Sequence, residues 1–336
     1  MLSFLKKKGV ELSLRTYLVT ALSYMALGLF SSLIIGLIIR TAGQQTGIEM
    51  MIRMGQVAMD LMGPAIGVAI AYGLKAPPLV MFASAAAGAF GAVSGGPAGA
   101  YVAALLATEC GKLVAGSTRV DIILTPLATI VVGFFAAEYL GFYIDQGLVA
   151  FGELVNWSVE QQPFLMGVLV AALMGLALTA PISSAAIAIM IGLDGLAAGA
   201  ATVGCSAQMV GFAVSSYREN GVGGFIAQGI GTSMLQIGNV LKHPLIIIPP
   251  TLAGAILAPL STLVFGMQNT PEGAGMGTAG FVGQIFTFTS MGFSWDILAI
   301  VIMLHIIGPA ILCLMISEFM RRRGWINPGD MTLKTE

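Results

Sequence analysis

The stretch TYLVTALSYMALGLFSSLIIGLII, residues 16–39, decides the fold class of this chain. It contains no charged side chain. As an α-helix it would extend about 36 Å at ~1.5 Å per residue, which exceeds the ~30 Å hydrocarbon core of a bilayer. The apolar region of a cleaved signal peptide has only about 7–15 residues. We therefore predict that residues 16–39 are a retained membrane span.

The composition of the whole chain agrees with this first span. Hydrophobic residues make up 57% of the 336 residues and charged residues only 9%, whereas a soluble domain has about 25% charged residues. Because so few charges cannot cover a water-exposed surface, we expect an all-α polytopic membrane protein in contact with membrane lipid. The net charge of −1 gives no basic field, which excludes nucleic acid as a partner.

Further apolar segments follow, separated by glycine, proline or isolated charges. We place them at about 57–74, 78–93, 97–114, 121–144, 163–180, 181–193, 195–216, 222–241 and 244–266, with a last span at about 295–319. The chain is predicted to have about 10–12 membrane segments, and this number includes short or re-entrant helices. The segments 78–93 and 181–193 are short for a full crossing, and we expect half-helices or hairpins among such segments.

Lysine and arginine lie mainly near the two ends of the chain. Residues 6–8 and Arg15 precede the first span, and residues 321–323 follow the last. The stretch 145–162 has three acidic residues and no basic one. Since short cytoplasmic loops carry the excess of Lys and Arg, we predict that both termini are cytoplasmic and that 145–162 lies outside. The predicted location is the bacterial cytoplasmic (inner) membrane, crossed many times.

Two parts of the chain, about 57–144 and about 181–266, resemble each other. A shift of 127 positions pairs Gly96 with Gly223 and Glu109 with Gln236. With the predicted orientation, the second copy starts from the opposite face of the membrane, so the repeats are predicted to be inverted. Inverted repeats with broken helices are typical of secondary transporters. We treat residues 1–336 as a single transmembrane domain.

A glycine-rich loop, about 267–293, precedes the last span. Its segment NTPEGAGMGTAG, residues 269–280, is a poor lipid-facing helix, because each glycine costs ~1 kcal/mol relative to alanine. Non-helical backbone at membrane depth persists only where protein buries it or a water-filled cavity solvates it. We therefore predict that Asn269, Thr270 and Glu272 line a site for a polyhydroxylated solute, with a plain solvated loop as the alternative.

Other polar residues within or between apolar segments are further candidates for solute binding. They are, in chain order, Gln208, Gln236, Asn239 and His243. Neutral carboxamides avoid the cost of burying a charge in the membrane. An alternative role for His243 is to cap a helix C-terminus. Glu109 and Lys112 are three positions apart on one predicted helix, where a salt bridge between them is expected.

Motifs for catalysis, nucleotides and metals are not found. The sequence has no GxxxxGK[ST] and no HExxH, and its three cysteines, Cys110, Cys205 and Cys313, are far apart in apolar stretches. We predict no catalytic residue, no cofactor and no metal site, and interpret the cysteines as structural thiols.

The basic N-terminus, the duplicated glycine-rich spans and Thr270-Pro271-Glu272-Gly273 before a last helix with basic residues resemble a known family. The family is enzyme IIC, the membrane component of the bacterial sugar phosphotransferase system. More narrowly, the chain is similar to the stand-alone IIC-like branch that includes a regulator of the perfringolysin toxin. The resemblance covers essentially the whole chain.

The resemblance implies a homodimer in which a transport domain moves against a scaffold. It also implies a cytoplasmic IIB-type phosphocarrier protein, since no IIA or IIB domain is recognised in the chain. A glutamate on a late re-entrant loop and a histidine bind sugar hydroxyls in this family. Glu272 is similar to that glutamate in context, and His243 is the candidate for the histidine.

The leading hypothesis is a IIC-like permease for a small hydrophilic solute, a sugar or sugar derivative. The chain would be at most the membrane subunit of a sugar phosphotransferase. One alternative is a membrane-embedded regulator that senses a solute without net transport. Another is an ion-coupled transporter outside the phosphotransferase system, in which Asp60, Glu109 and Glu272 carry protons.

Overall fold

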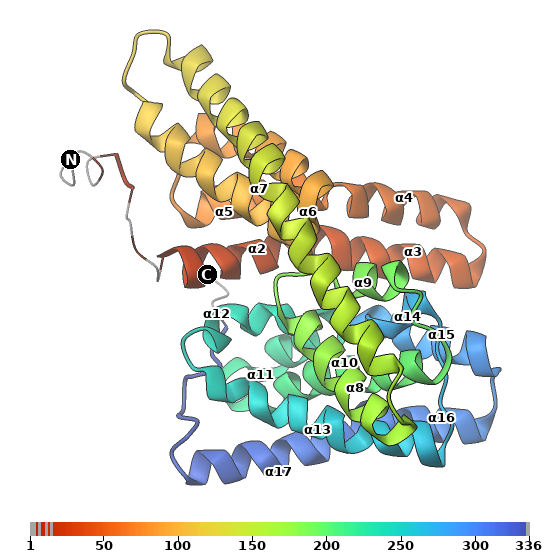
Figure 1. Cartoon of the computed structure of the whole chain (residues 1–336). Coiled ribbons are helices and arrows are strands. Elements are labelled where there is room, and N and C mark those ends of the chain that lie inside the picture. The colour runs from red at the N-terminus through yellow and green to blue at the C-terminus, as the bar shows by residue number, and fades with distance from the viewer. Residues whose placement is uncertain (1–4, 6–7, 11–12, 14–15, 334–336) are drawn as a thin grey trace. The chain divides into compact units, whose positions relative to one another are not determined.

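The computed structural model describes residues 5, 8–10, 13 and 16–333 (Figure 1). The basic residues Lys6, Lys7 and Arg15, used to predict orientation, lie outside the described residues. Within the described part the regular structure is helical, and the only β-type contact is an isolated bridge between Gly195 and Asn269. The predicted all-α fold class is confirmed.

Six of the described helical stretches are long and apolar enough to cross a membrane. They are Val19–Thr46, Pro78–Val114, Asp121–Val159, Gly195–Ser215, Pro244–Val264 and Trp295–Arg322. The helices α4 (Glu49–Asp60) and α5 (Met62–Gly73), bent by 47°, form a seventh candidate if they are one span. The shorter apolar helix α8 spans Pro163–Thr179. The structure thus confirms a polytopic protein with short and broken helices among its segments.

The chain divides into two compact units, residues 1–147 and 148–336. The boundary falls within helix α7 (Asp121–Val159). This helix continues past the predicted end of its segment at 144, so most of the stretch 145–162 is helical.

The first span of unit 1 consists of α2 (Leu22–Leu29) and α3 (Ile35–Thr46), with π-helical turns at Thr16–Ala21 and Phe30–Ile34. A turn at Gly47 leads into α4, which packs back against α3. The two helices approach closely: a Cβ on Gly36 would lie 2.7 Å from the carbonyl oxygen of Gly55. Sequence analysis placed no helix at 49–56, because charged and polar residues interrupt its apolar pattern.

Helix α6 (Pro78–Val114) is a hairpin of two arms. Gly95 and Gly96 have non-helical backbone angles, with φ 57° and ψ −143° at Gly96. The Oγ atom of Ser84 in the first arm lies 3.0 Å from Oγ1 of Thr108 in the second. Each arm extends about 26 Å at ~1.5 Å per residue, less than a ~30 Å hydrocarbon core. The predicted separation of 78–93 from 97–114 is confirmed.

Helix α10 (Gly195–Ser215) forms the core of unit 2. In the most apolar stretch of α10, 94% of the residues are buried inside the protein. The helix packs against α8, α13 (Ile248–Pro259) and α17 (Gly308–Arg322) (Figure 1). Small residues on α10 permit this packing: a Cβ on Gly204 would collide with the backbone oxygen of Ala171. Close approach of backbones at small residues is how membrane helices gain contact area.

After α10 the chain reverses into α11 (Tyr217–Ile226) and a π-helical turn at Ala227–Gly231. The reversal is fastened by Gln228, whose Nε2 donates to Oγ of Ser216 at 2.9 Å. Gly221 interrupts α11 with φ 59° and ψ −158°, close to the angles of Gly96 in unit 1, and glycine is the residue that adopts them without strain. Gly221 lies two positions before Gly223, the residue that the shift of 127 pairs with Gly96, so the two breaks are similar in geometry but do not occupy paired positions. The repeat and its inversion remain predictions.

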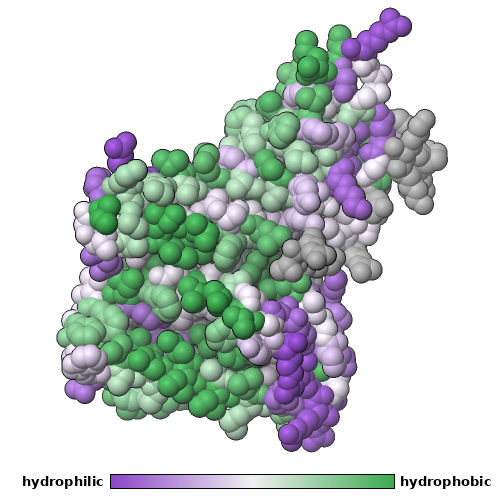
Figure 2. Space-filling view, turned by 180° about the vertical axis from the view of Figure 1, so that it is seen from behind, coloured by the Kyte–Doolittle hydropathy of each residue, from purple (hydrophilic) through white to green (hydrophobic). Residues whose placement is uncertain are grey.

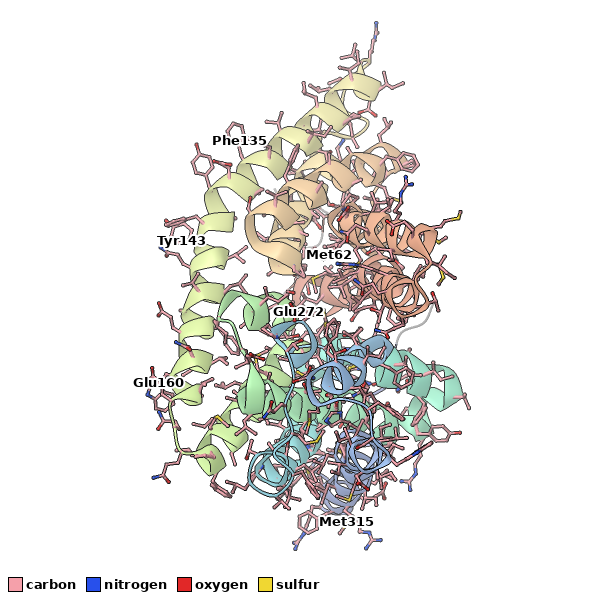
Figure 3. The ribbon with its side chains drawn as sticks, turned by 90° about the vertical axis from the view of Figure 1, so that its right-hand side faces the viewer. Met62, Phe135, Tyr143, Glu160, Glu272 and Met315 are labelled. Atoms are coloured by element: carbon pink, nitrogen blue, oxygen red, sulfur yellow. The ribbon has the colours of Figure 1, made fainter. Side chains whose placement is uncertain are left out.

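The outer surface of the protein is largely apolar. Figure 2 shows hydrophobic side chains over wide areas of the visible face, with hydrophilic side chains gathered in patches. Large exposed side chains include Ile122, Ile123, Phe135 and Tyr143 of α7 (Figure 3). Soluble proteins rarely expose apolar area on this scale, whereas lipid tails cover it at no cost.

Candidate functional site

Asn269 is the anchor of the glycine-rich loop. Its side chain is 0% exposed, and the two N–H groups of Nδ2 are shared among three acceptors: Oγ1 of Thr202 at 2.7 Å, the carbonyl oxygen of Gly283 at 2.9 Å and Oγ1 of Thr287 at 3.1 Å. Its Oδ1 accepts from the backbone N–H of Thr270 at 2.8 Å. The carboxamide is therefore occupied by protein groups and fixes the start of the loop.

Glu272 lies on the one-turn helix α14 (Pro271–Ala274), with its side chain exposed (Figure 3). No hydrogen bond or ion pair joins its carboxylate to another described residue. Next to it, the Oγ1 atom of Thr270 is buried and has no hydrogen-bond partner in the described structure. The loop thus carries an exposed carboxylate, and the hydroxyl next to it is buried and unbonded among the described residues.

The glycines of the loop let it lie against other helices. A Cβ on Gly275 would lie 2.5 Å from the backbone of Ser184, at the start of α9 (Ser184–Met190), and one on Gly277 would lie 2.6 Å from the backbone of Cys205 in α10. The hydroxyl of Ser184 also donates to the carbonyl oxygen of Gly275 at 2.7 Å. Protein packing therefore buries this irregular backbone, which is one of the two conditions for its survival at membrane depth.

Gln208 lies away from the loop's hydrogen bonds and links three helices. It is 0% exposed; its Nε2 donates to Oγ1 of Thr251 in α13 at 2.7 Å, and its Oε1 accepts from Oγ1 of Thr179 in α8 at 3.3 Å. The Thr179 hydroxyl also lies 2.8 Å from that of Ser233. These contacts give Gln208 a role in holding the core of unit 2 together.

The other three predicted site residues converge on the C-terminal segment. Gln236 donates from Nε2 to the carbonyl oxygen of Met331, and Asn239 from Nδ2 to that of Thr332, both at 2.9 Å. The Nδ1 atom of His243 lies 3.5 Å from Oδ1 of Asp330. The structure brings these side chains together around a peptide segment of the same chain.

Sequence analysis did not single out a buried cluster of Ser206, Gln284 and His305. The Nε2 atom of Gln284 lies 3.1 Å from Nδ1 of His305 and 3.4 Å from Oγ of Ser206. The Oε1 atom of Gln284 is buried without a partner in the described structure. His305 belongs to a π-helical turn, Ile302–Ile307, and such turns are frequent at functional sites. In the sequence, the signal that could have indicated this cluster is a histidine, His305, within an apolar span.

The predicted ion pair of unit 1 is confirmed. Nζ of Lys112 lies 3.3 Å from Oε1 of Glu109, and it also donates to the carbonyl oxygen of Leu74 at 3.1 Å. The pair therefore joins the second arm of α6 to the end of α5. In the described residues, no group of three or more His, Cys, Asp or Glu side chains is placed to hold a metal ion.

Broken helices, an apolar surface and a buried irregular loop that carries one exposed carboxylate define a polytopic membrane protein of the transporter class. A family model described as "Phosphotransferase system, EIIC" matches residues 19–333. The chain therefore belongs to the EIIC family, the membrane components of the bacterial sugar phosphotransferase system. It is a multi-pass bacterial membrane protein. No curated protein and no solved structure matched the chain.

Proposed function

We propose that this EIIC-family chain is a permease for a small sugar or sugar derivative, and that Glu272 binds hydroxyl groups of the solute. The observation that carries the proposal is the exposed carboxylate of Glu272 on a loop whose other residues are held by the protein. A carboxylate accepts charge-assisted hydrogen bonds from hydroxyl groups, each worth about 1.5–3 kcal/mol net.

Thr270 completes the proposed contact. Its buried Oγ1 atom, which has no partner among the described residues, can both donate and accept. Asn269 supports the site from beneath without touching the solute, because its own hydrogen-bonding groups are satisfied by the protein. The narrower likeness to the branch with the perfringolysin regulator stays a prediction.

The family implies the partners of the proposed permease. EIIC proteins work with a IIB protein that phosphorylates the sugar. We propose that a separate IIB-type phosphocarrier serves this chain from the cytoplasm, that both termini lie on that side of the inner membrane, and that the working unit is a homodimer. The basic residues 321–323 at the end of α17 support the orientation.

Uptake by purified protein in liposomes tests the function. The probes are radiolabelled hexoses, N-acetylhexosamines, hexitols and pentoses, each with and without a phosphorylated IIB protein in the cytoplasmic compartment. Saturable uptake of one probe, with its phosphate ester formed only when IIB is present, is the expected result.

Other outcomes identify the alternatives. Saturable binding without uptake would contradict a permease and favour a solute-sensing regulator. Uptake that follows an imposed proton gradient and ignores IIB would favour an ion-coupled transporter.

A further inference from the structure

The C-terminal residues 326–333, here called the strap, lie against three carboxamide side chains, here called the cradle: Asn220, Gln236 and Asn239. Asn220 bonds the strap twice, from Nδ2 to the carbonyl oxygen of Met331 at 2.9 Å and through Oδ1 from the N–H of Leu333 at 2.8 Å. Gln236 donates to the same carbonyl oxygen of Met331, and Asn239 donates to the carbonyl oxygen of Thr332. All of these bonds go to the strap backbone, as they do when proteins bind extended peptides.

Apolar side chains anchor the same segment. Ile326 and Met331 are each 1% exposed and pack in one cluster with Phe212, Ile246 and Met320. The strap therefore has the two parts of a bound peptide: backbone hydrogen bonds to the cradle and apolar side chains in a pocket of the protein.

The outer edge of the strap is weakly held. The ion pair of His243 with Asp330 spans 3.5 Å, and the His243 side chain is 45% exposed. Pairs that water reaches in this way contribute little to stability. Thr332, the next-to-last residue of the strap, is also exposed. Detachment can thus begin from this edge without opening the core.

The cradle is built on short, irregular pieces of backbone. Asn220 precedes the break at Gly221, Gln236 ends a 3₁₀ turn (Ser233–Gln236), and Asn239 lies in the one-turn helix α12 (Ile237–Val240). Segments with so few regular backbone bonds open at low free energy unless other contacts hold them. The strap makes such contacts with all three segments.

Polar groups beside the cradle are incompletely bonded. Arg321 pairs with Glu219 at 2.7 Å, yet Nε of Arg321, Oε2 of Glu219 and Oγ of Ser215 are buried without partners in the described structure. Buried polar atoms of this kind are costly, and an alternative arrangement that hydrates them lowers the cost.

We propose that the strap is a releasable tethered ligand that locks residues 217–243 in the arrangement seen here, and that it leaves the cradle when this segment moves. The inference does not rest on the identity of the solute or on Glu272. Release would free one N–H of each of the three carboxamides, while Gln236 keeps its bonds to Gln228 and Asn239. Such N–H groups can bond the oxygen of a hydroxyl or of a peptide group.

The test follows the buried Met331 in the full-length protein. The parent variant carries Met331→Cys, with the native cysteines replaced, and its rate of maleimide labelling is measured in nanodiscs. We expect Gln236→Ala to raise that rate by about two- to twelvefold, because it removes one of the strap's bonds, worth about 0.5–1.5 kcal/mol. Gln161→Ala, which alters an exposed carboxamide outside the cradle, is the matched control and should leave the rate unchanged.

A second measurement tests the lock itself. The double variant His243→Cys/Asp330→Cys is cross-linked by a short reducible reagent, and amide hydrogen exchange of residues 217–243 is followed before and after reduction. Exchange there should slow when the strap is cross-linked and recover on reduction, while α13 stays unchanged.

Two results would overturn the proposal. One is equal labelling of Met331→Cys in the parent, the Gln236→Ala variant and an Asn239→Ala variant. The other is exchange at 217–243 that is the same with the strap cross-linked and reduced. If Gln236→Ala does not fold, Asn239→Ala carries the first measurement, because it removes a bond nearer the exposed end.

Discussion

The Nδ2 atom of Asn269 donates a 2.7 Å hydrogen bond to Oγ1 of Thr202, and this bond ties the glycine-rich loop to the central helix of unit 2. The loop would otherwise begin with an exposed polar residue, as the sequence suggests. Asn269 is buried, so the position of Glu272 depends on a residue whose hydrogen-bonding groups are occupied by the protein. The predictions below separate these two roles.

Replacing Asn269 should destabilise the protein. Asn269→Ala removes the donor shared by the hydroxyls of Thr202 and Thr287, which each keep a bond to a backbone carbonyl, and leaves the N–H of Thr270 without its acceptor. Each lost hydrogen bond costs about 0.5–1.5 kcal/mol net. We expect a lower thermal unfolding midpoint in detergent, whereas Gln268→Ala, at an exposed neighbouring position, should behave like wild type. Unchanged stability with lost solute binding would instead make Asn269 a direct ligand.

Replacing Glu272 should weaken solute binding and leave the stability of the protein unchanged. Glu272→Gln keeps the shape of the side chain but weakens its charge-assisted bonds to solute hydroxyls, so we predict at least a ~tenfold rise in Kd. The unfolding midpoint should not change, because the side chain is exposed. Equilibrium binding of the transported probe measures the effect, and Glu160→Gln, also exposed, is the control (Figure 3). Wild-type affinity in Glu272→Gln would show that the loop is only a connector.

The two helix breaks should each require glycine. Alanine at Gly96 or Gly221 meets no atom within 4 Å, so any loss of stability arises from the positive φ alone. We expect each substitution to lower the free energy of unfolding by about 1–3 kcal/mol.

Gly223→Ala is the matched control for the breaks. Gly223 also has open space around it but does not have a positive φ, so alanine there should be neutral or slightly stabilising. If all three variants have the same stability, the unusual backbone angles of Gly96 and Gly221 are not a constraint on this fold.

The proposed orientation is tested by single cysteines in intact cells. Glu153→Cys should react with a membrane-impermeant maleimide from the periplasm, and Arg322→Cys should react only after permeabilisation. Both positions are exposed in the structure. Equal reactivity of the two positions would remove the orientation and, with it, the inference that the repeats are inverted.

Sequence analysis succeeded where a local property decides the structure. The uncharged run of residues 16–39 lies almost wholly in the first span, and the glycine pair at 95–96 does break α6. It missed α4, because that helix is stabilised by packing against α3 and carries too few apolar residues to be recognised alone. It also ended α7 too early, since acidic residues near 145–160 suggested a loop.

The candidate site was less accessible to sequence analysis. Gln236 and Asn239 are polar residues in an apolar context, which is all that the sequence shows. Their partners, Met331 and Thr332, lie more than ninety positions away along the chain. Whether such a carboxamide faces a solute, a helix or the chain's own terminus depends on contacts that no local pattern encodes.

The sequence by itself determined that this protein is a multi-pass helical membrane protein, because the cost of placing residues in a bilayer is summed along each segment. The residue pattern over 19–333 also determined its family, EIIC. Only the tertiary structure decided which polar residues are occupied. The side chain of Asn269 is hydrogen-bonded to Thr202, and that of Gln208 is hydrogen-bonded to Thr251. The carboxylate of Glu272 is exposed. A hydrogen bond needs two groups within about 3 Å in a suitable direction, and that condition is set by how the helices pack.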